Sequence, residues 1–161
     1  KDGLRHAVQP SVPAANRVFG QSSGLLMLSK HPFARGGGSA EQSSATAPFA
    51  NYTIKAAITR KSTAWACFSV QGAVLHVFTL HLDAHYAATR AKQLSEFADF
   101  ARKHAPAVFS HGSDEKEQAS VTEFAIALGD WNIDARDSNE MRLLLAAVRP
   151  LKLVGSSWFA R

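Results

Sequence analysis

The chain has 161 residues, 46% of them hydrophobic, and a formal net charge of +5. This size and apolar content suffice for one hydrophobic core, so we expect a single domain over residues 1–161. The single cysteine, Cys67, excludes an intrachain disulfide framework and is expected to be a small core residue, and the longest apolar run is far shorter than the roughly 20 residues that span a bilayer.

Basic residues exceed acidic ones in the first 60 residues, whereas the two kinds are balanced in the rest of the chain. A basic half is compatible with an anionic partner such as a phosphate or an acidic lipid surface. The excess is scattered and contains no basic run, which favours an ordinary solvated surface over such a partner. The N-terminal residues show no signal-peptide pattern.

The first third of the chain predicts little regular structure. A short apolar run from Gly24 to Ser29 is typical of a buried strand, which the extended dipeptide His31-Pro32 ends. The segment 34–48, ARGGGSAEQSSATAP, is rich in Gly and Ser and predicts a mobile surface loop or a variable insertion.

Three strands are predicted next, over residues 52–60, 63–70 and 73–82. Gln71-Gly72 supplies a two-residue hairpin turn between the last two of them. The third strand is apolar nearly throughout, as in a strand covered on both faces. His76 within it is interpreted as a core or edge histidine without a functional role.

The second half alternates helices and strands. Apolar residues recur at helical spacing over 87–104, which predicts an amphipathic helix that Pro106 ends. Residues 122–128, TEFAIAL, predict a buried strand, and residues 137–149 predict a second helix capped by Asp137 or Ser138. An antiparallel middle followed by this alternation favours a mixed, layered α/β fold.

Polar residues with catalytic potential follow two of these strands. His81 stands at the end of one, and Asp130 and Asn132 follow the other in the stretch GDWN. An Asp can orient water or bind Mg²⁺, an Asn can donate amide hydrogens to a phosphoryl oxygen, and a His can donate a proton to a departing oxygen. The combination suits attack of water on a phosphoester, although Gly, Asp and Asn are also the residues of an ordinary turn.

Four motifs, in order, resemble those of the endonuclease/exonuclease/phosphatase superfamily of metal-dependent phosphoesterases, which has the deoxyribonuclease-I-like fold. The motifs are SSGLLMLSKHPF, HVFTLHLDA, TRAKQLSEFADF and IALGDWN. The resemblance runs from about Gly20 to about Leu145. It implies a layered α/β sandwich of two sheets with outer helices.

Within this superfamily, the stretches SGLLMLSKHPF and RKSTAWACFSV are most similar to neutral sphingomyelinases. That resemblance implies a Mg²⁺-dependent phosphodiesterase that hydrolyses sphingomyelin to ceramide and phosphocholine at a membrane surface. The protein would then be membrane-associated or secreted, like its relatives, and the sequence indicates no oligomer. The alternatives are a nuclease acting on nucleic acid, an inositol-phosphate phosphatase, or a degenerate non-catalytic module that holds anionic lipid or a partner protein.

The resemblance also implies roles for single residues. His81 would donate to the phosphate or the leaving group, Asp130 would bind the metal and activate water, and Asn132 would hold a phosphoryl oxygen. Arg90 and Gln93 match the helix motif, and for them we expect a structural role that ties helix to sheet. Asp83 is interpreted as a turn residue.

Several positions depart from the family pattern. Leu80 stands where relatives have Thr, and Ser62 follows Lys61 where relatives usually have Gly. The metal-binding Glu that the family carries upstream is missing, because residues 1–23 contain no Glu, and no His follows Asn132 to form the family's final Asp-His pair. We therefore expect a fragment, with the fold incomplete at both ends, and assign the function to a longer protein.

Overall fold

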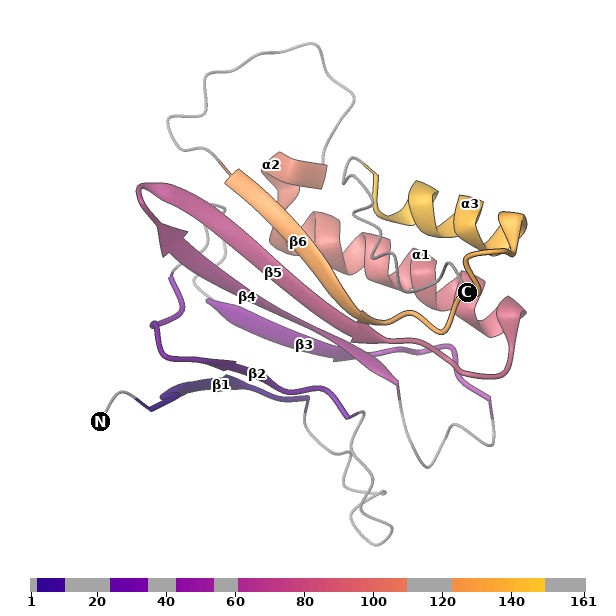
Figure 1. The fold of residues 1–161 in the computed structure, drawn as a ribbon, viewed down its shortest axis with the longest axis horizontal. Helices are drawn as coiled ribbons and strands as arrows, with labels where there is room; N and C mark the ends of the chain where they lie inside the picture. The colour runs from indigo at the N-terminus through magenta and orange to yellow at the C-terminus, as the bar shows by residue number, and fades with distance from the viewer. Residues whose placement is uncertain (1–2, 11–23, 35–42, 54–60, 110–122, 150–161) are drawn as a thin grey trace, which may run out of the picture.

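The computed structural model describes residues 3–10, 24–34, 43–53, 61–109 and 123–149, and every structural statement below refers to these residues. They form six strands and three helices (Figure 1). The elements in chain order are β1 (His6–Val8), β2 (Met27–Ser29), β3 (Ser44–Pro48), β4 (Ser62–Val70), β5 (Ala73–His81), α1 (Ala87–His104), α2 (Pro106–Phe109), β6 (Glu123–Asp130) and α3 (Ser138–Ala147).

The larger sheet has four strands in the order β3-β4-β5-β6. The first three are antiparallel neighbours, and β6 pairs with β5 in parallel. A parallel pair needs a crossover connection, which here contains α1 and α2. The predicted hairpin is confirmed, since Gln71 and Gly72 both have positive φ, as a tight two-residue turn between twisted strands requires.

The layers lie on the two faces of this sheet. Helices α1, α2 and α3 lie on one side of the sheet, and the antiparallel pair β1-β2 lies on the other (Figure 1). Alternate side chains of β4 serve both layers: Trp65 packs among the residues that contact the helices, whereas Ala64 and Ala66 pack with Val8 of β1. The predicted layered α/β fold is confirmed.

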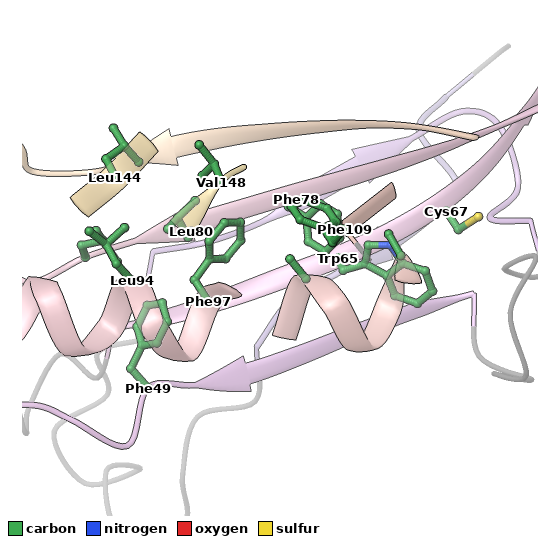
Figure 2. Close-up of a cluster of buried hydrophobic side chains, with 13 residues drawn as sticks. Phe49, Trp65, Cys67, Phe78, Leu80, Leu94, Phe97, Phe109, Leu144 and Val148 are labelled. Atoms are coloured by element: carbon green, nitrogen blue, oxygen red, sulfur yellow. The ribbon is translucent and has the colours of Figure 1, made fainter. Parts of the chain in front are cut away.

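Five aromatic and eight smaller apolar residues form the core between sheet and helices (Figure 2). Phe78 of β5 makes edge-to-face contacts with Phe97 and Phe109, with ring centroids 5.9 Å and 5.8 Å apart. Such contacts add to the stabilisation from burial alone. Cys67 is fully buried in the same cluster, which confirms its core role, and burial raises the pKa of its thiol to about 11.

Both long helices occur as predicted. Helix α1 has the predicted bounds, and its apolar stripe faces the core. Helix α3 begins after Asp137, whose side chain accepts hydrogen bonds from the backbone N–H groups of Asn139 and Glu140. No helix in the described part of the chain is long and apolar enough to cross a membrane.

The N-terminal elements differ from the prediction. Residues 44–48 were predicted to be part of a loop, but they form β3, which pairs with β4 over five residues. Pairing with a strong neighbouring strand supplies the hydrogen bonds, so a weak Ser/Ala/Thr pattern suffices at a sheet edge. The predicted strand from Gly24 shortens to Met27–Ser29. Most of the predicted strand 52–60 lies outside the described residues, and its first two residues are not in a strand.

Strand β6 was predicted to be buried, and this prediction is wrong for one of its faces. Its helix-facing residues Ala125 and Ala127 pack against the core. On the opposite face, Phe124, Ile126 and Leu128 are about half exposed, at 55%, 46% and 51%. A run of apolar residues does not distinguish one covered face from two, and the described part of the chain covers only one.

Candidate active site at the carboxyl ends of β5 and β6

His81 and Asp130 lie at the same edge of the sheet because their strands are parallel neighbours. Each is the last residue of its strand, and the two are direct partners in the β5-β6 register. His81 Nε2 lies 3.5 Å from Asp130 Oδ2. The structure thus brings together an imidazole and a carboxylate that lie far apart in the sequence, and both remain accessible, with side chains 25% and 60% exposed.

Gly129 allows β6 to lie close to β5 at this edge. Its φ is +133°, and a Cβ at this position would lie 2.0 Å from the backbone oxygen of Leu80. No side chain fits there. The backbone N–H of Leu82 then donates to the Asp130 carbonyl at 3.0 Å, which extends the pairing of the two strands beyond His81.

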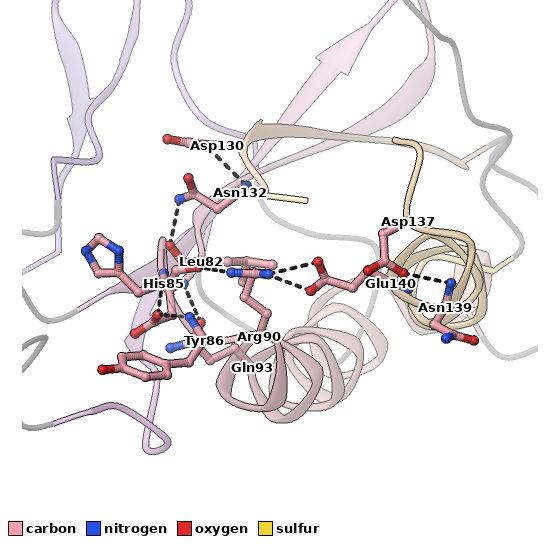
Figure 3. Close-up of polar contacts among 11 residues, drawn as sticks. Leu82, His85, Tyr86, Arg90, Gln93, Asp130, Asn132, Asp137, Asn139 and Glu140 are labelled. Carbon is pink, nitrogen blue, oxygen red and sulfur yellow. Dashed lines mark hydrogen bonds and ion pairs between the residues drawn. The ribbon is translucent and has the colours of Figure 1, made fainter. Parts of the chain in front are cut away.

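Asn132 closes the turn that follows β6. Its φ is +50°, a left-handed conformation in which the backbone bends away from the extended path of β6. Its backbone N–H donates to Asp130 Oδ1 at 3.1 Å, and its side-chain Nδ2 donates to the carbonyl of Leu82 at 2.9 Å (Figure 3). Asn132 therefore orients the Asp130 carboxylate and ties the loop to β5, while its role toward a phosphoryl oxygen stays a prediction.

Asp83 shapes the turn between β5 and α1. It is almost fully buried, and its Oδ1 accepts hydrogen bonds from the backbone N–H groups of His85 at 2.8 Å and Tyr86 at 2.9 Å (Figure 3). Its backbone N–H donates to Gln93 Oε1 at 2.8 Å. The interpretation of Asp83 as a turn residue is confirmed.

Arg90 and Gln93 anchor α1 to the strand ends, as expected. The guanidinium of Arg90 donates twice to the Glu140 carboxylate, both at 2.8 Å, and once to the carbonyl of Asp83 at 3.1 Å (Figure 3). Hydrogen bonding to Glu140 raises the pKa of Arg90. Gln93 Nε2 donates to the carbonyl of Asn51 at 2.8 Å. These bonds hold α1, α3 and the turn after His81 together.

Lys61 joins the site although it was not among the predicted site residues. It directly precedes β4, and its Nζ lies 2.5 Å from His81 Nε2. Burial lowers the pKa of the Lys61 ammonium, and the negative charges of Asp130 and Asp83 oppose this shift. A usable signal was present in the sequence: counting outward from the hairpin turn pairs Ser62 with His81, which puts Lys61 at the same edge.

His76 lies away from the site, in agreement with its interpretation as a core or edge histidine. It is buried, and its Nδ1 accepts a hydrogen bond from Trp65 Nε1 at 3.1 Å. Because Nδ1 accepts this bond, Nε2 carries the proton and donates to Glu123 Oε2 at 3.0 Å. Both ring nitrogens are thus satisfied by the core and the sheet.

Asp130 is the group of the site most suited to Mg²⁺. Mg²⁺ prefers oxygen ligands and keeps several waters, binding through one or two carboxylates together with substrate phosphates. The exposed Asp130 carboxylate fits one such position, whereas the Asp83 carboxylate is buried in its turn. Within the described ranges, no group of three or more His, Cys, Asp or Glu residues is placed to hold a metal ion.

Comparison with known proteins identifies the fold. No family model matches the sequence, and no curated protein matches it. Among solved structures, sphingomyelinase C from Streptomyces griseocarneus superimposes with a TM-score of 0.56 at 20% identity, over 78% of this chain and 38% of that one. A beta toxin from Staphylococcus aureus with bound magnesium ions (TM-score 0.55, 19% identity) and SmcL (0.55, 17%) each match over 78% of this chain and 39% of theirs.

These likenesses confirm the predicted deoxyribonuclease-I-like fold. At such identities they show the fold alone. The chain spans less than two fifths of the length of these structures.

Proposed function

We propose that this chain belongs to a Mg²⁺-dependent phosphodiesterase that hydrolyses sphingomyelin to ceramide and phosphocholine. The observation that carries the proposal is the pairing of His81 with Asp130, 3.5 Å apart at the carboxyl ends of parallel strands. Sites in α/β folds gather at this edge because a rigid sheet aims side chains from several strands at one point. The fold is shared with a sphingomyelinase C, which supports the choice of substrate.

The groups of the site suit an in-line displacement at phosphorus. Asp130 orients a water molecule, whose oxygen forms a new bond to phosphorus while the bond to the ceramide oxygen breaks. His81 donates a proton to that departing oxygen, and the proton lost by the water passes to Asp130 or to solvent. Mg²⁺ held at Asp130 would polarise the phosphoryl oxygen. Asn132, fixed against Leu82, keeps the Asp130 carboxylate in its orientation.

A substrate panel tests the proposal on the complete protein that contains this chain. We expect Mg²⁺-dependent release of phosphocholine from sphingomyelin vesicles, and no turnover of single-stranded or abasic DNA or of phosphoinositides. Hydrolysis of DNA or of phosphoinositides instead would assign the site to another branch of the superfamily. Absence of turnover on every substrate would favour a non-catalytic binding module.

The substitution Asp130→Asn tests the site itself. It removes the charge that orients water while keeping the shape of the side chain, so we expect turnover to fall by at least about 10³-fold with the fold unchanged. Asp134→Asn is the matched control, because Asp134 lies in the same loop but pairs with exposed Arg136, which lowers the Asp134 pKa to about 2. Equal activity in the two variants would refute the role of Asp130.

A further inference from the structure

The Lys61 ammonium has no ion-pair partner among the residues that the structure describes. No carboxylate oxygen of those residues lies within 4.0 Å of its Nζ. Its close neighbour is His81 Nε2, at 2.5 Å. An ammonium has three N–H donors and no acceptor, so at most one of them is directed at Nε2, which accepts it while the imidazole is neutral, and two N–H groups remain in either protonation state of His81.

The surroundings of Lys61 favour the arrival of an anion. Burial lowers the pKa of this ammonium, which means that the site removes part of its hydration. Asp83 cannot compensate at close range, because its carboxylate is held in the turn by the N–H groups of His85 and Tyr86. Asp130 is likewise held, through Oδ1, by the N–H of Asn132. An oxyanion placed against the two remaining N–H groups would replace the lost hydration with charge-assisted hydrogen bonds.

We infer that Lys61 binds a non-bridging oxygen of the substrate phosphodiester, beside His81. This inference deepens the proposed function and rests on it for the identity of the substrate. Three neighbouring strands would then serve one phosphate, with Lys61 from the start of β4, His81 from the end of β5 and Asp130 from the end of β6. The antiparallel pairing of Ser62 with His81 fixes the position of Lys61 at this edge.

The assignment also predicts a contribution to the chemical step. Negative charge on the non-bridging oxygens must be stabilised throughout phosphoryl transfer, so a fixed cation beside them assists both binding and turnover. Lys61 is a flexible point charge rather than a planar fork, so arginine would preserve the charge but not the contact geometry with His81.

Binding of a simple phosphodiester to the 161-residue chain tests this without catalysis. Dimethyl phosphate is titrated in the absence of Mg²⁺ and followed by nuclear magnetic resonance. We expect Lys61→Met to weaken binding by about tenfold or more, and Lys61→Arg to retain part of it. Lys92→Met is the control for the loss of one positive charge, since Lys92 is exposed on α1, and it should change the affinity less than about twofold.

A second measurement uses the unchanged chain and does not depend on the folding of any variant. The side-chain Nζ resonance of Lys61 should shift on addition of dimethyl phosphate, whereas that of Lys92 should not. No shift at Lys61, no binding by the unchanged chain, or equal binding by Lys61→Met and Lys92→Met would each overturn the inference.

Activity of the complete protein separates this inference from the proposed function. If the protein hydrolyses sphingomyelin, Lys61→Met should lower kcat/KM by about 10²-fold through both a higher KM and a lower kcat, with partial rescue by Lys61→Arg. Hydrolysis that Lys61→Met leaves unchanged would overturn the role of Lys61 while the proposed function stands. Lys61-dependent binding without any hydrolysis would overturn the proposed function and leave Lys61 as the cation of a phosphodiester-binding site.

Discussion

Arg90→Met should be the most informative test of how the site is supported. The guanidinium of Arg90 connects α1 to Glu140 of α3 and to the carbonyl of Asp83, which lies just after His81 in the chain. Both side chains of the ion pair are almost buried, at 10% and 11% exposure. Methionine keeps the aliphatic stem but removes all three hydrogen bonds, so the Glu140 carboxylate is left buried without its partner.

The size of the effect follows from the burial. Removing one partner of a buried ion pair costs about 3–5 kcal/mol, because the remaining charge stays desolvated. For a domain of this size, each kcal/mol lowers Tm by roughly 2–4 °C, so we expect a decrease of about 10 °C. The exposed pair Arg102–Asp99 on α1 is the internal control, with side chains 54% and 74% exposed, and Arg102→Met should cost less than about 0.5 kcal/mol.

Urea unfolding followed by tryptophan fluorescence measures both variants against the unchanged chain. The double variant Arg90→Met/Glu140→Leu completes the design, since it removes both charges and should recover much of the lost free energy of unfolding. If Arg90→Met is no more destabilising than Arg102→Met, or if the double variant is worse than the sum of the single changes, the role assigned to the Arg90–Glu140 pair is wrong.

Two further predictions concern a backbone position and a buried histidine. Gly129→Ala should lower the free energy of unfolding by at least about 2 kcal/mol, because the added Cβ would lie 2.0 Å from the backbone oxygen of Leu80. Gly72→Ala is the control, since its φ is +83° but a Cβ there would have no atom within 4 Å. It should lower the free energy of unfolding by only about 1 kcal/mol in the same urea assay. Burial lowers the pKa of His104 in the folded chain below the ordinary imidazole value of 6.5, so the stability that the neutral ring contributes is present above that value and is lost as the pH falls below it. His104→Phe should therefore reduce the loss of stability between about pH 7.5 and 5.5, and an unchanged pH dependence would contradict the assignment.

The parts of the fold that were predictable have strong local patterns. Helix α1 follows from its apolar spacing, and the β4-β5 hairpin from two β-rich runs around Gln71-Gly72. Strand β3 has no such pattern. It forms because its backbone groups, which every sequence carries, pair with those of β4. The exposure of Phe124, Ile126 and Leu128 could not be predicted from the sequence either, since it depends on which layers cover β6.

The site shows the same division between local and tertiary information. His81 and Asp130 were predictable because each ends a recognisable strand, and parallel pairing brings the ends together. The conformation of Asn132 was not, because a left-handed backbone and a hydrogen bond to Leu82 decide where its amide points. A short motif therefore identifies which residues meet but not which of their atoms face a ligand.

The position of Lys61 shows how much of the site the strand register alone can predict. A two-residue turn at Gln71-Gly72 pairs residues whose numbers sum to a constant, so Ser62 must face His81 once both strands reach nine residues. The parallel register then pairs His81 with Asp130, provided that Gly129 allows the backbones to approach. Three charged or titratable groups thus converge because of two registers and one glycine.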